Sequence, residues 1–293
     1  MIPTQILSCS RYTSTITTRT FSTSARALIS TQPKFQERIL PFHLSPRSLF
    51  TQASNRRTHL QSRTMSTGPI DEGDPVSEKY NAPYLKLYSM GTPNGVKITV
   101  YLSLLKLDYH YRKLNIMTNE QKEEWFLKLN PNGRIPVLTD VNEKGEVYPI
   151  METGAILLYL GEKYDKERKY YYGVDAGKLY WDQIQWLTFQ IASHAPYQGQ
   201  ANHFNSFAKE DVPYGKKRYT DETKRVFGVF ERRLKDNNGW LVGDHLNIAD
   251  ISAWAWIRAA PNYAKIELDE WPLIQKWIKA IEEIPGVQEG IIA

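Results

Sequence analysis

The chain has 293 residues, of which 41% are hydrophobic, enough apolar side chain for one large core or two smaller ones. No run approaches 18 consecutive apolar residues, so we expect no transmembrane helix and no membrane partner. The net charge of +5 arises in residues 1–64, which hold nine Lys and Arg against one acid, whereas the remainder holds 28 basic and 31 acidic residues, so nucleic acid is not an expected partner.

The sequence has one cysteine, Cys9, which lies in the basic N-terminal stretch. From residue 65 onward the chain therefore excludes a disulfide framework, a Cys-x-x-Cys redox pair and a cysteine nucleophile. The histidines of that region show no metal-ligand spacing, so we expect no metal. Any sulfur chemistry would need a thiol supplied by a co-substrate.

Residues 1–64 are rich in Ser, Thr and Arg, the composition of an organelle transit peptide, and residues 19–22, Arg-Thr-Phe-Ser, resemble a mitochondrial processing site. We therefore expect a mitochondrial protein if translation begins at Met1 and a cytoplasmic one if it begins at Met65. A low-complexity tail is the alternative. The Gly and Pro content of residues 65–83 predicts a flexible linker, so that residues 1 to about 80 contribute nothing to the fold.

Residues 84–167 alternate strand and helix signals. Strands are predicted at 85–88, 109–113, 137–139 and 147–150, and helices at 96–107, at 120–129 and from Glu152 to about Tyr164. The first three elements form a right-handed βαβ unit, and the last two strands form an antiparallel hairpin. This order predicts a thioredoxin-like α+β domain with a mixed four-stranded sheet.

A turn at residues 130–134 leads into Ile135, Pro136 and an apolar run from Val137. Pro136 has no N–H for a ladder, so it can precede a strand but not lie inside it. If the Ile135–Pro136 bond is cis, the backbone N–H and C=O of Ile135 face outward and can pair with an extended peptide. An ordinary trans proline is the alternative, and the local sequence does not decide between them.

Glu152 and Thr153 open an apolar run of helical period. The free N–H groups of such a helix start bind anions, and the neighbouring carboxylate can bind a cation. Together they would hold the ammonium and the carboxylate at the end of an amino acid. The alternative is that both side chains merely cap the helix.

Residues 175–293 are predicted to form an all-helical domain. Helical periods fall at 180–194, 219–234, 248–259 and 273–281, with a breaker-rich stretch from Pro196 to Pro213. Asn247 and Asp250 are spaced as a capping box at the start of the third helix. The tryptophans of this half are expected to be core residues: Trp181, Trp186, Trp254, Trp256 and Trp277.

The order of these motifs, with Ile135-Pro136 and Glu152-Thr153 in the first half and the Asn247 box in the second, resembles the cytosolic-type glutathione S-transferases. The resemblance covers about residues 84–290. More narrowly, the segments 92–95, 130–132 and 198–204 are similar to the branch that joins the bacterial nu class to fungal relatives of the yeast nitrogen-catabolite regulator. It implies the glutathione S-transferase fold, with glutathione as co-substrate.

The resemblance also implies site residues. Those binding glutathione would be Gln121 at the glycyl end, Ile135 and Pro136 at the cysteinyl part, and Glu152 and Thr153 at the γ-glutamyl end. Thr92 and Asn94 would be the catalytic residues that meet the thiol. Arg218 would reach the γ-glutamyl group of a neighbouring subunit, which implies a two-fold homodimer.

Two positions depart from the pattern of that branch. Thr153 stands where serine is usual, which keeps the hydroxyl. Residues 193–197 replace a Gly-rich turn and put the bulk of His194 and Tyr197 near the second substrate. With Asn202 and His203, these two side chains define the expected second-substrate pocket, whose electrophile or disulfide cannot be named by analogy.

A free thiol with a pKa near 8.5 is only about 3% thiolate at pH 7, so catalysis means stabilising the anion. The Thr92 hydroxyl, the Asn94 amide and the N–H groups of the helix that starts near Gly95 can donate to the sulfur. Lowering the pKa by about two corresponds to roughly 2.7 kcal/mol, within reach of two charge-assisted hydrogen bonds. Tyr88 is the rival activating group, but we expect it to pack against the helical half.

Three functions are compatible with these residues. The first is a transferase that adds glutathione to electrophiles, as in detoxification. The second is a glutathione-dependent disulfide or peroxide reductase, in which a second glutathione acts as the resolving thiol. The third is a non-catalytic regulator that keeps the fold to bind a partner.

Overall fold

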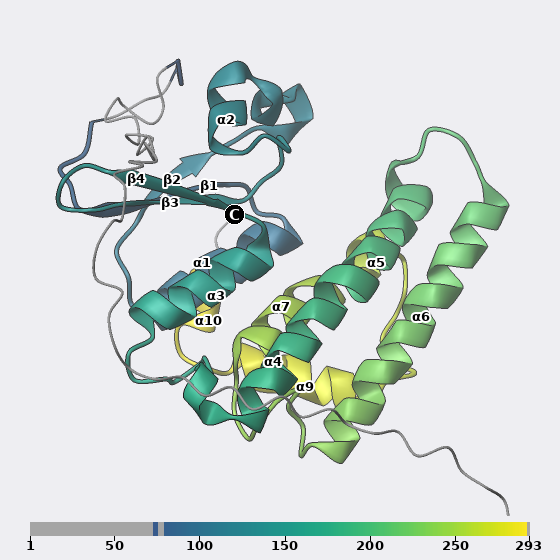
Figure 1. Cartoon of the computed structure of the whole chain (residues 1–293). Coiled ribbons are helices and arrows are strands. Elements are labelled where there is room, and N and C mark those ends of the chain that lie inside the picture. Colours follow the sequence, from purple (N-terminus) through teal and green to yellow (C-terminus); the bar gives the residue numbers. More distant parts are fainter. Residues whose placement is uncertain (1–72, 76–78, 292–293) are drawn as a thin grey trace, which may run out of the picture. The chain divides into compact units, whose positions relative to one another are not determined.

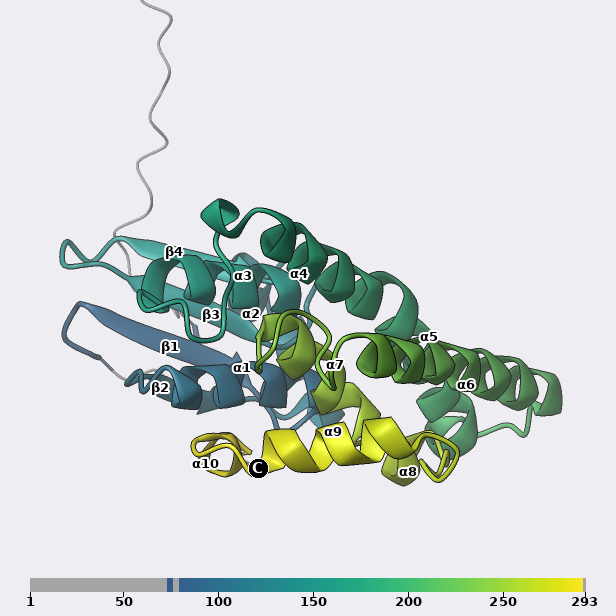
Figure 2. The same ribbon diagram turned by 90° about the horizontal axis from the view of Figure 1, so that it is seen from below.

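The computed structural model describes residues 73–75 and 79–291. The leader predicted for residues 1–64 lies outside this part of the chain, so mitochondrial targeting stays a prediction. The described residues form a sheet-containing N-terminal domain followed by a helical domain (Figures 1 and 2). Within these ranges, the helices are all too short or too polar to cross a membrane.

The N-terminal domain is built on four strands in the order β2-β1-β3-β4. They are β1 (Tyr84–Ser89), β2 (His110–Lys113), β3 (Val137–Val141) and β4 (Val147–Met151). β1 runs parallel to β2 and antiparallel to β3, and β3 is antiparallel to β4. This is the predicted mixed sheet, and the thioredoxin-like fold is confirmed.

Three helices cover the sheet: α1 (Pro93–Leu104), α2 (Glu124–Leu129) and α3 (Thr153–Tyr164). Figure 1 shows α1 and α3 on one side of the sheet and α2 on the other. The helix predicted for 120–129 is split, since Glu120–Lys122 form a separate 3-10 turn before α2. The two layers on opposite faces give the domain two cores.

The second half is helical, as predicted. Its helices are α4 (Lys178–Phe189), α5 (Ala195–Asn202), α6 (Pro213–Asp236), α7 (Ile248–Ile257), α8 (Ala260–Tyr263), α9 (Pro272–Glu282) and α10 (Val287–Gly290). Figure 2 shows α9 and α10 along one side of the bundle, with α10 beside α1. Gly290 allows α10 to approach α1 this closely, because a Cβ atom at that position would lie only 2.4 Å from the Cα of Val100.

Of the breaker-rich stretch predicted from Pro196 to Pro213, only residues 208–212 interrupt the helices. α4 continues through a π-helical turn, Gln190–His194, into α5, and a second π-helical turn, His203–Phe207, follows. At the junction the Ala195 N–H donates to the Gln190 carbonyl, five residues back. Pro196 then lies in the first turn of α5, where its missing N–H leaves no helical bond unmade.

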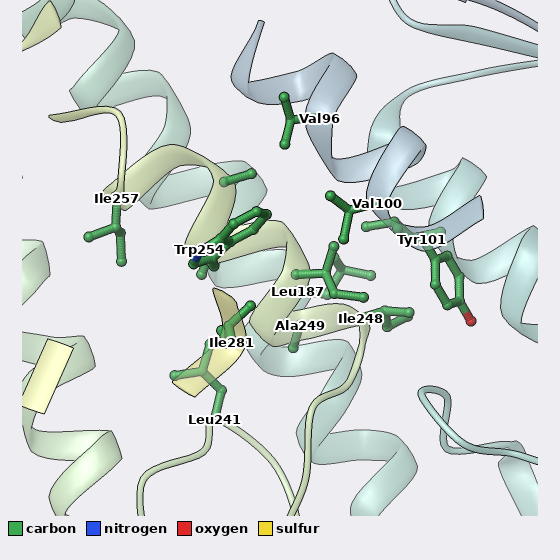
Figure 3. Close-up of a cluster of buried hydrophobic side chains, with 14 of the residues drawn as sticks. Val96, Val100, Tyr101, Leu187, Leu241, Ile248, Ala249, Trp254, Ile257 and Ile281 are labelled. Atoms are coloured by element: carbon green, nitrogen blue, oxygen red, sulfur yellow. The ribbon is translucent and has the colours of Figure 1, made fainter. Parts of the chain in front are cut away.

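The larger core joins the two halves. Val96 and Val100 of α1 pack in one buried cluster with Leu187 of α4 and with Ile248 and Trp254 of α7 (Figure 3). Since α1 also flanks the sheet, this cluster holds the helical domain against the face of the N-terminal domain that carries α1 and α3. The site residues of the two halves are thereby brought to one region.

Tyr88 lies in the smaller core, on the face of the sheet that carries α2. It is fully buried, and its ring centroid is 6.2 Å from those of Trp125 and Phe126. The prediction that Tyr88 is packed is therefore correct, but its neighbours belong to α2 and not to the helical half. Strand alternation explains this, because neighbouring residues of β1 point to opposite faces.

The tryptophans of the helical half do not all behave as predicted. Trp254 and Trp277 are core residues, whereas Trp181 is 61% exposed on α4. Trp256 is half-buried, two residues beyond Trp254 on α7, and so faces another direction. The prediction of a core role is wrong for Trp181, and Trp256 belongs to the site described below.

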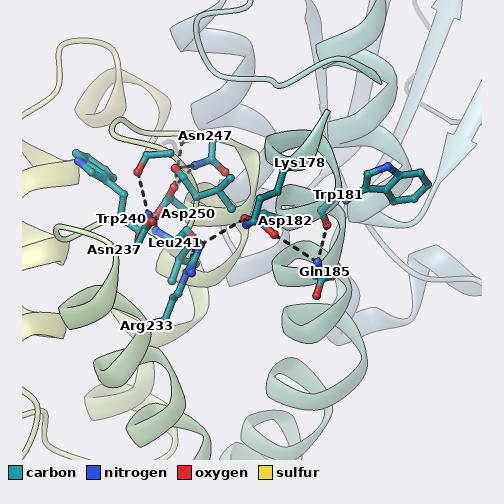
Figure 4. Close-up of polar contacts among 12 residues, drawn as sticks. Lys178, Trp181, Asp182, Gln185, Arg233, Asn237, Trp240, Leu241, Asn247 and Asp250 are labelled. Atoms are coloured by element: carbon teal, nitrogen blue, oxygen red, sulfur yellow. Dashed lines mark hydrogen bonds and ion pairs between the residues drawn. The ribbon is translucent and has the colours of Figure 1, made fainter. Parts of the chain in front are cut away.

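The predicted capping box at the start of α7 is present. The Asn247 side chain accepts from the Ala249 N–H, and the Asp250 carboxylate accepts from the Asn247 N–H. Asp250 is fully buried and also accepts from the Leu241 N–H and the Trp277 indole N–H. Figure 4 shows Asp250 at the centre of these contacts between α7 and the loop that precedes it.

Asp74 is tied to the N-terminal domain, although residues 65–83 were expected to be a flexible linker. Its buried carboxylate accepts from Nε and Nη2 of Arg112 on β2, with a shortest distance of 2.7 Å. The same guanidinium pairs with Glu120. A guanidinium presents several donors in a fixed fork, so it can hold both carboxylates at once. At Asp74 the chain is therefore part of the fold.

We expect Asp74→Ala to lower the free energy of unfolding by about 1.5–3 kcal/mol, the usual loss for a buried hydrogen bond to a charged group. Urea unfolding at pH 7 measures it. Asp236→Ala, at an exposed position at the end of α6, is the control and should change stability by less than about 0.5 kcal/mol. Equal stability of the two variants would show that the Asp74 contact does not hold in solution.

Candidate functional site

A cavity of about 570 Å³ opens where the N-terminal domain meets α5 and α7. The N-terminal domain contributes Thr92, Pro93, Asn94, Ile116, Gln121, Asn130, Asn132, Arg134, Ile135, Pro136, Glu152 and Thr153. The helical domain contributes Gly199, Asn202, Phe207 and Trp256. Residues from five separate segments of the N-terminal domain and from three helical segments thus line one cavity.

Asn94 is held in a defined orientation at this wall. The indole N–H of Trp256 donates to Asn94 Oδ1 at 2.8 Å. Because an indole nitrogen can only donate, the oxygen of the Asn94 amide must face Trp256, and its NH₂ group must point elsewhere. The contact leaves both amide N–H donors of Asn94 available to a ligand in the cavity.

Thr92 is the N-cap residue of α1, and its Oγ1 accepts from the Gly95 N–H at 3.2 Å. Its own hydroxyl hydrogen is therefore available as a donor. Val96 N–H donates to the Thr92 carbonyl, and Pro93 has no N–H. Among the N–H groups at the start of α1, the backbone N–H of Asn94 therefore remains available to a thiol.

The turn before β3 is braced by Asn130. Its Nδ2 donates to the Arg134 carbonyl at 2.8 Å, and its Oδ1 accepts from the Asn132 N–H at 3.0 Å. The Ile135–Pro136 peptide bond is cis, the form that the sequence left open. Pro136 is buried and Val137 begins the strand, as the missing proline N–H requires.

Glu152 directly precedes α3 and has a positive φ of 70°, an uncommon conformation for a residue with a side chain. Its carboxylate makes no capping hydrogen bond to α3. The capping alternative therefore does not account for Glu152. Such backbone outliers persist where the surroundings enforce them and are concentrated at binding sites.

Two buried acceptors in the cavity wall have no hydrogen-bond donor from the described chain. They are Oε1 of Gln121, a residue 9% exposed, and Oδ1 of Asn202, a residue 8% exposed. A buried acceptor without a donor costs about 1–3 kcal/mol, so such an atom usually accepts a hydrogen bond from a water molecule or a ligand. Gln121 belongs to the N-terminal domain and Asn202 to the helical domain.

Four of the predicted site residues do not line this cavity. His194 is fully buried at the end of the π-helical turn that precedes α5, and its Nε2 lies 2.7 Å from Gln198 Oε1. Burial lowers the pKa of His194 to about 3. His203 is exposed on the second π-helical turn. Tyr197 and Arg218 line a different cavity of about 560 Å³ between α5 and α6. The structure thus brings together eight predicted residues: Thr92, Asn94, Gln121, Ile135, Pro136, Glu152, Thr153 and Asn202.

Two residues, one in the cavity wall and one directly behind it, were not predicted from the sequence. Trp256 gave no signal, because its burial class depends on what its helix packs against. Lys97 did have a signal in the sequence, because it is a charged residue between the apolar residues Val96 and Ile98 near the start of a helix. In the structure it is 1% exposed and lies directly behind Thr153.

The part of the chain that the structure describes contains no group of three His, Cys, Asp or Glu side chains arranged to hold a metal ion. The cavity instead offers hydroxyl, amide and carboxylate groups on a partly apolar wall. This set of groups suits an organic ligand with both charges and amides.

Residues 83–162 match the N-terminal domain family of the glutathione S-transferases, and residues 195–285 match the C-terminal domain family. The chain is 35% identical over 210 residues to the disulfide-bond oxidoreductase YfcG of Escherichia coli, covering 71% of this chain and 94% of that protein. It is 32% identical to protein URE2 of Eremothecium gossypii, covering 68% of this chain and 65% of the relative. A crystal structure of a glutathione transferase homolog from Lodderomyces elongisporus, with two glutathione molecules per subunit, is 44% identical with a TM-score of 0.68, covering 71% of this chain and 97% of that one.

Two matched domains in the expected order, together with a thioredoxin-like sheet and a helical bundle, define the class of protein. The chain belongs to the glutathione S-transferase family. Within it, the similarity to URE2 proteins and to fungal structures puts the chain in the URE2-like fungal branch.

Proposed function

We propose that the protein binds glutathione in the 570 Å³ cavity and activates its thiol for attack on electrophilic substrates. The observation that carries this proposal is the fixed Asn94 amide, which turns its donors away from Trp256. A thiolate has strong acceptor character, and nearby donors lower the pKa of a thiol. The glutathione-bound structures of relatives in the same branch support it.

In this proposal, Glu152 and Thr153 hold the ammonium and the carboxylate of the γ-glutamyl end. The main chain of Ile135, next to Pro136, pairs with the cysteinyl unit, and the unsatisfied Oε1 of Gln121 accepts from an N–H near the glycyl end. Thr92 and Asn94 donate to the sulfur. These residues share one cavity wall, which supports their acting on one ligand.

A glutathione-dependent disulfide reductase is the second candidate, favoured by Asn202. Its unsatisfied Oδ1 lies on the side of the cavity formed by the helical domain, where the second substrate would bind. A buried acceptor favours a substrate that carries an N–H, such as a glutathionyl mixed disulfide. The bound glutathione thiolate would attack one sulfur, form a new disulfide and release the other sulfur as thiolate, which takes up a proton. The name of the Escherichia coli relative supports this candidate.

Calorimetric titration with glutathione, followed by assays with a chloronitrobenzene, a glutathionyl mixed disulfide and a hydroperoxide, tests the proposal. Binding together with any of these reactions supports thiol activation, and the preferred substrate decides between the two candidates. Binding without activity would favour the regulator, and a lack of binding would refute the proposal.

Replacement of Asn202 by leucine removes the acceptor at similar volume. If a polar disulfide is the second substrate, we expect kcat/KM for the mixed disulfide to fall about tenfold or more, as for a lost substrate hydrogen bond. The Kd for glutathione should stay within about twofold, because the proposed glutathione contacts belong to the N-terminal domain and Asn202 belongs to the helical domain. A fall in chloronitrobenzene transfer that matches the fall in disulfide reduction would argue against a specific role for the amide.

We further propose a homodimer in which Arg218 serves the partner's glutathione site. Arg218 is exposed on α6 and lines the 560 Å³ cavity, apart from the proposed site of its own chain. In the proposed homodimer, α6 would bring Arg218 to the glutathione site of the partner chain.

A further inference from the structure

Lys97 is a buried cation behind the proposed binding site. It lies on α1 and is 1% exposed, so its ammonium group has no access to water. Its Nζ donates to Thr153 Oγ1 at 3.3 Å and to Gln190 Oε1 at 3.0 Å. Thr153 lines the cavity, whereas Lys97 does not. The lysine is thus one hydrogen bond removed from any ligand held by Thr153.

The groups around Lys97 come from three elements. Glu152, before α3, is the facing carboxylate, and its charge raises the lysine pKa. His194, from the π-helical turn, is the facing histidine, and burial keeps it neutral. α7 contributes the hydroxyl of Ser252, which also donates to Gln190 Oε1, and the ring of Trp256, 5.9 Å from Nζ. α10 meets α1 at Thr99, further along the helix.

This environment compensates the lysine charge poorly. Burial lowers the pKa of Lys97 from its usual 10.5 to about 7, and the charge of Glu152 offsets only part of that effect. Two neutral acceptors and an aromatic face are weak substitutes for the hydration of an ammonium group. With its pKa this close to neutral pH, the protonation of Lys97 can respond to the charge of a nearby ligand.

We propose that Lys97 is a positioning residue that takes up a proton when the γ-glutamyl carboxylate binds at Thr153, and that its charged form turns the Thr153 hydroxyl toward that carboxylate. This inference rests on the proposed function, because it requires glutathione at the site.

The direction of the Thr153 hydroxyl follows from what each form of the lysine can do. An ammonium group only donates, so Thr153 Oγ1 must accept from it, and the threonine hydrogen points to another acceptor. A neutral amine has a lone pair and can accept that hydrogen, which would turn it away from the ligand. A carboxylate on the other side of Thr153 thus favours the charged lysine through both its charge and its hydrogen bond.

The ligand charge acts in the same direction as the hydrogen bond. An opposite charge within about 4–6 Å changes a pKa by about 1–3. The ligand ammonium would lie against Glu152, on the exposed side of the helix start, and its carboxylate against Thr153. The carboxylate is therefore the nearer ligand charge to Lys97.

Calorimetry with S-methylglutathione tests the proposal, because this ligand has no thiol to titrate. Binding is measured at pH 8 in two buffers with different ionisation enthalpies. We expect uptake of roughly half to one proton per ligand, and a Kd that rises above pH 7 by at most about tenfold per pH unit. Tight binding with no proton uptake between pH 6.5 and 9 would overturn the inference and leave the proposed function intact. Absence of binding would overturn both.

Lys97→Met assigns the proton, since methionine fills similar volume without charge. The proton uptake should disappear in this variant, and the affinity should weaken most below pH 7, where the wild-type lysine is charged. Lys128→Met, at an exposed position of α2, should keep the wild-type uptake. The same uptake in Lys97→Met would overturn the proposal.

If that variant does not fold, NMR titration of ¹³Cε-labelled lysines in the wild-type protein tests the same proposal. The proposal is supported if one buried lysine titrates near pH 7 and its pKa increases when the ligand is bound. It is refuted if the ligand changes none of the lysine pKa values.

Discussion

Asn94→Ala is expected to raise the pKa of the bound glutathione thiol by about one to two, because one charge-assisted hydrogen bond is worth about 1.5–3 kcal/mol. The amide oxygen of Asn94 is occupied by the Trp256 indole, so the amide NH₂ is the group removed from the sulfur. At pH 7 the thiolate fraction, and with it the rate of attack, should fall about ten- to hundredfold. Ultraviolet thiolate absorbance, titrated on the glutathione complex, measures the pKa directly.

Trp256→Phe is the matched control for this geometry. It removes the indole N–H but keeps an aromatic ring, so the Asn94 amide is present but no longer oriented. We expect a smaller pKa increase than in Asn94→Ala. Tyr88→Phe should leave the thiol pKa within a few tenths, since Tyr88 packs against α2 and does not line the cavity. A large shift in Tyr88→Phe and none in Asn94→Ala would show that the wrong activating group has been assigned.

Thr92→Val decides the remaining case. If neither Asn94→Ala nor Tyr88→Phe moves the pKa although glutathione binds, the Thr92 hydroxyl or the backbone N–H at position 94 must carry the activation, and Thr92→Val distinguishes them. The Thr92 hydroxyl hydrogen is available because Oγ1 already accepts from the Gly95 N–H.

Asp250→Ala is expected to have the largest effect on stability, a loss of about 3–5 kcal/mol in the free energy of unfolding. The buried carboxylate accepts hydrogen bonds from the N–H groups of Leu241 and Asn247, which lie beside it in Figure 4, and from the indole of Trp277. Alanine leaves these buried donors without an acceptor and removes half of the capping box of α7. Chemical unfolding followed by circular dichroism measures the loss.

Asp244→Ala is the control for that variant, because Asp244 lies six residues earlier and its side chain is 91% exposed. It should change stability by less than about 0.5 kcal/mol. A loss below about 1 kcal/mol in Asp250→Ala would mean that water or rearranged side chains satisfy the donors. Because α7 also carries Trp256, the surviving folded fraction of Asp250→Ala should be assayed for glutathione binding as well.

Much of the fold could be predicted because its signals are local. Pro136 lacks an N–H and so had to precede β3, and the apolar spacing along α1 and α3 required faces that pack. Asn247 and Asp250 marked the start of α7 because a capping box satisfies N–H groups within four residues. The order of these elements was enough to predict the mixed sheet, the helical second half and the family.

Other features depend on contacts between distant segments, and no local pattern contains them. Trp254 and Trp256 are the same residue type two positions apart, yet one is core and the other meets Asn94 of the first domain. Asp74 falls in a stretch whose composition predicts a linker, and only the folded chain brings it into contact with Arg112. The breaker-rich stretch was predicted to begin at Pro196, but the π-helical turn before that residue lets the helix continue, and the break comes only at residues 208–212.

The amino-acid sequence was enough to predict the order of the elements and the turn and cap residues. Those properties follow from backbone geometry and from hydrogen bonds within a few residues. Three other properties became apparent only in the folded structure: the face of the sheet that Tyr88 occupies, the set of predicted residues that share the cavity, and the burial of Lys97 behind Thr153. Burial, pKa and the direction of an amide are set by the chain segments that pack around a residue, and those segments are far away in the sequence.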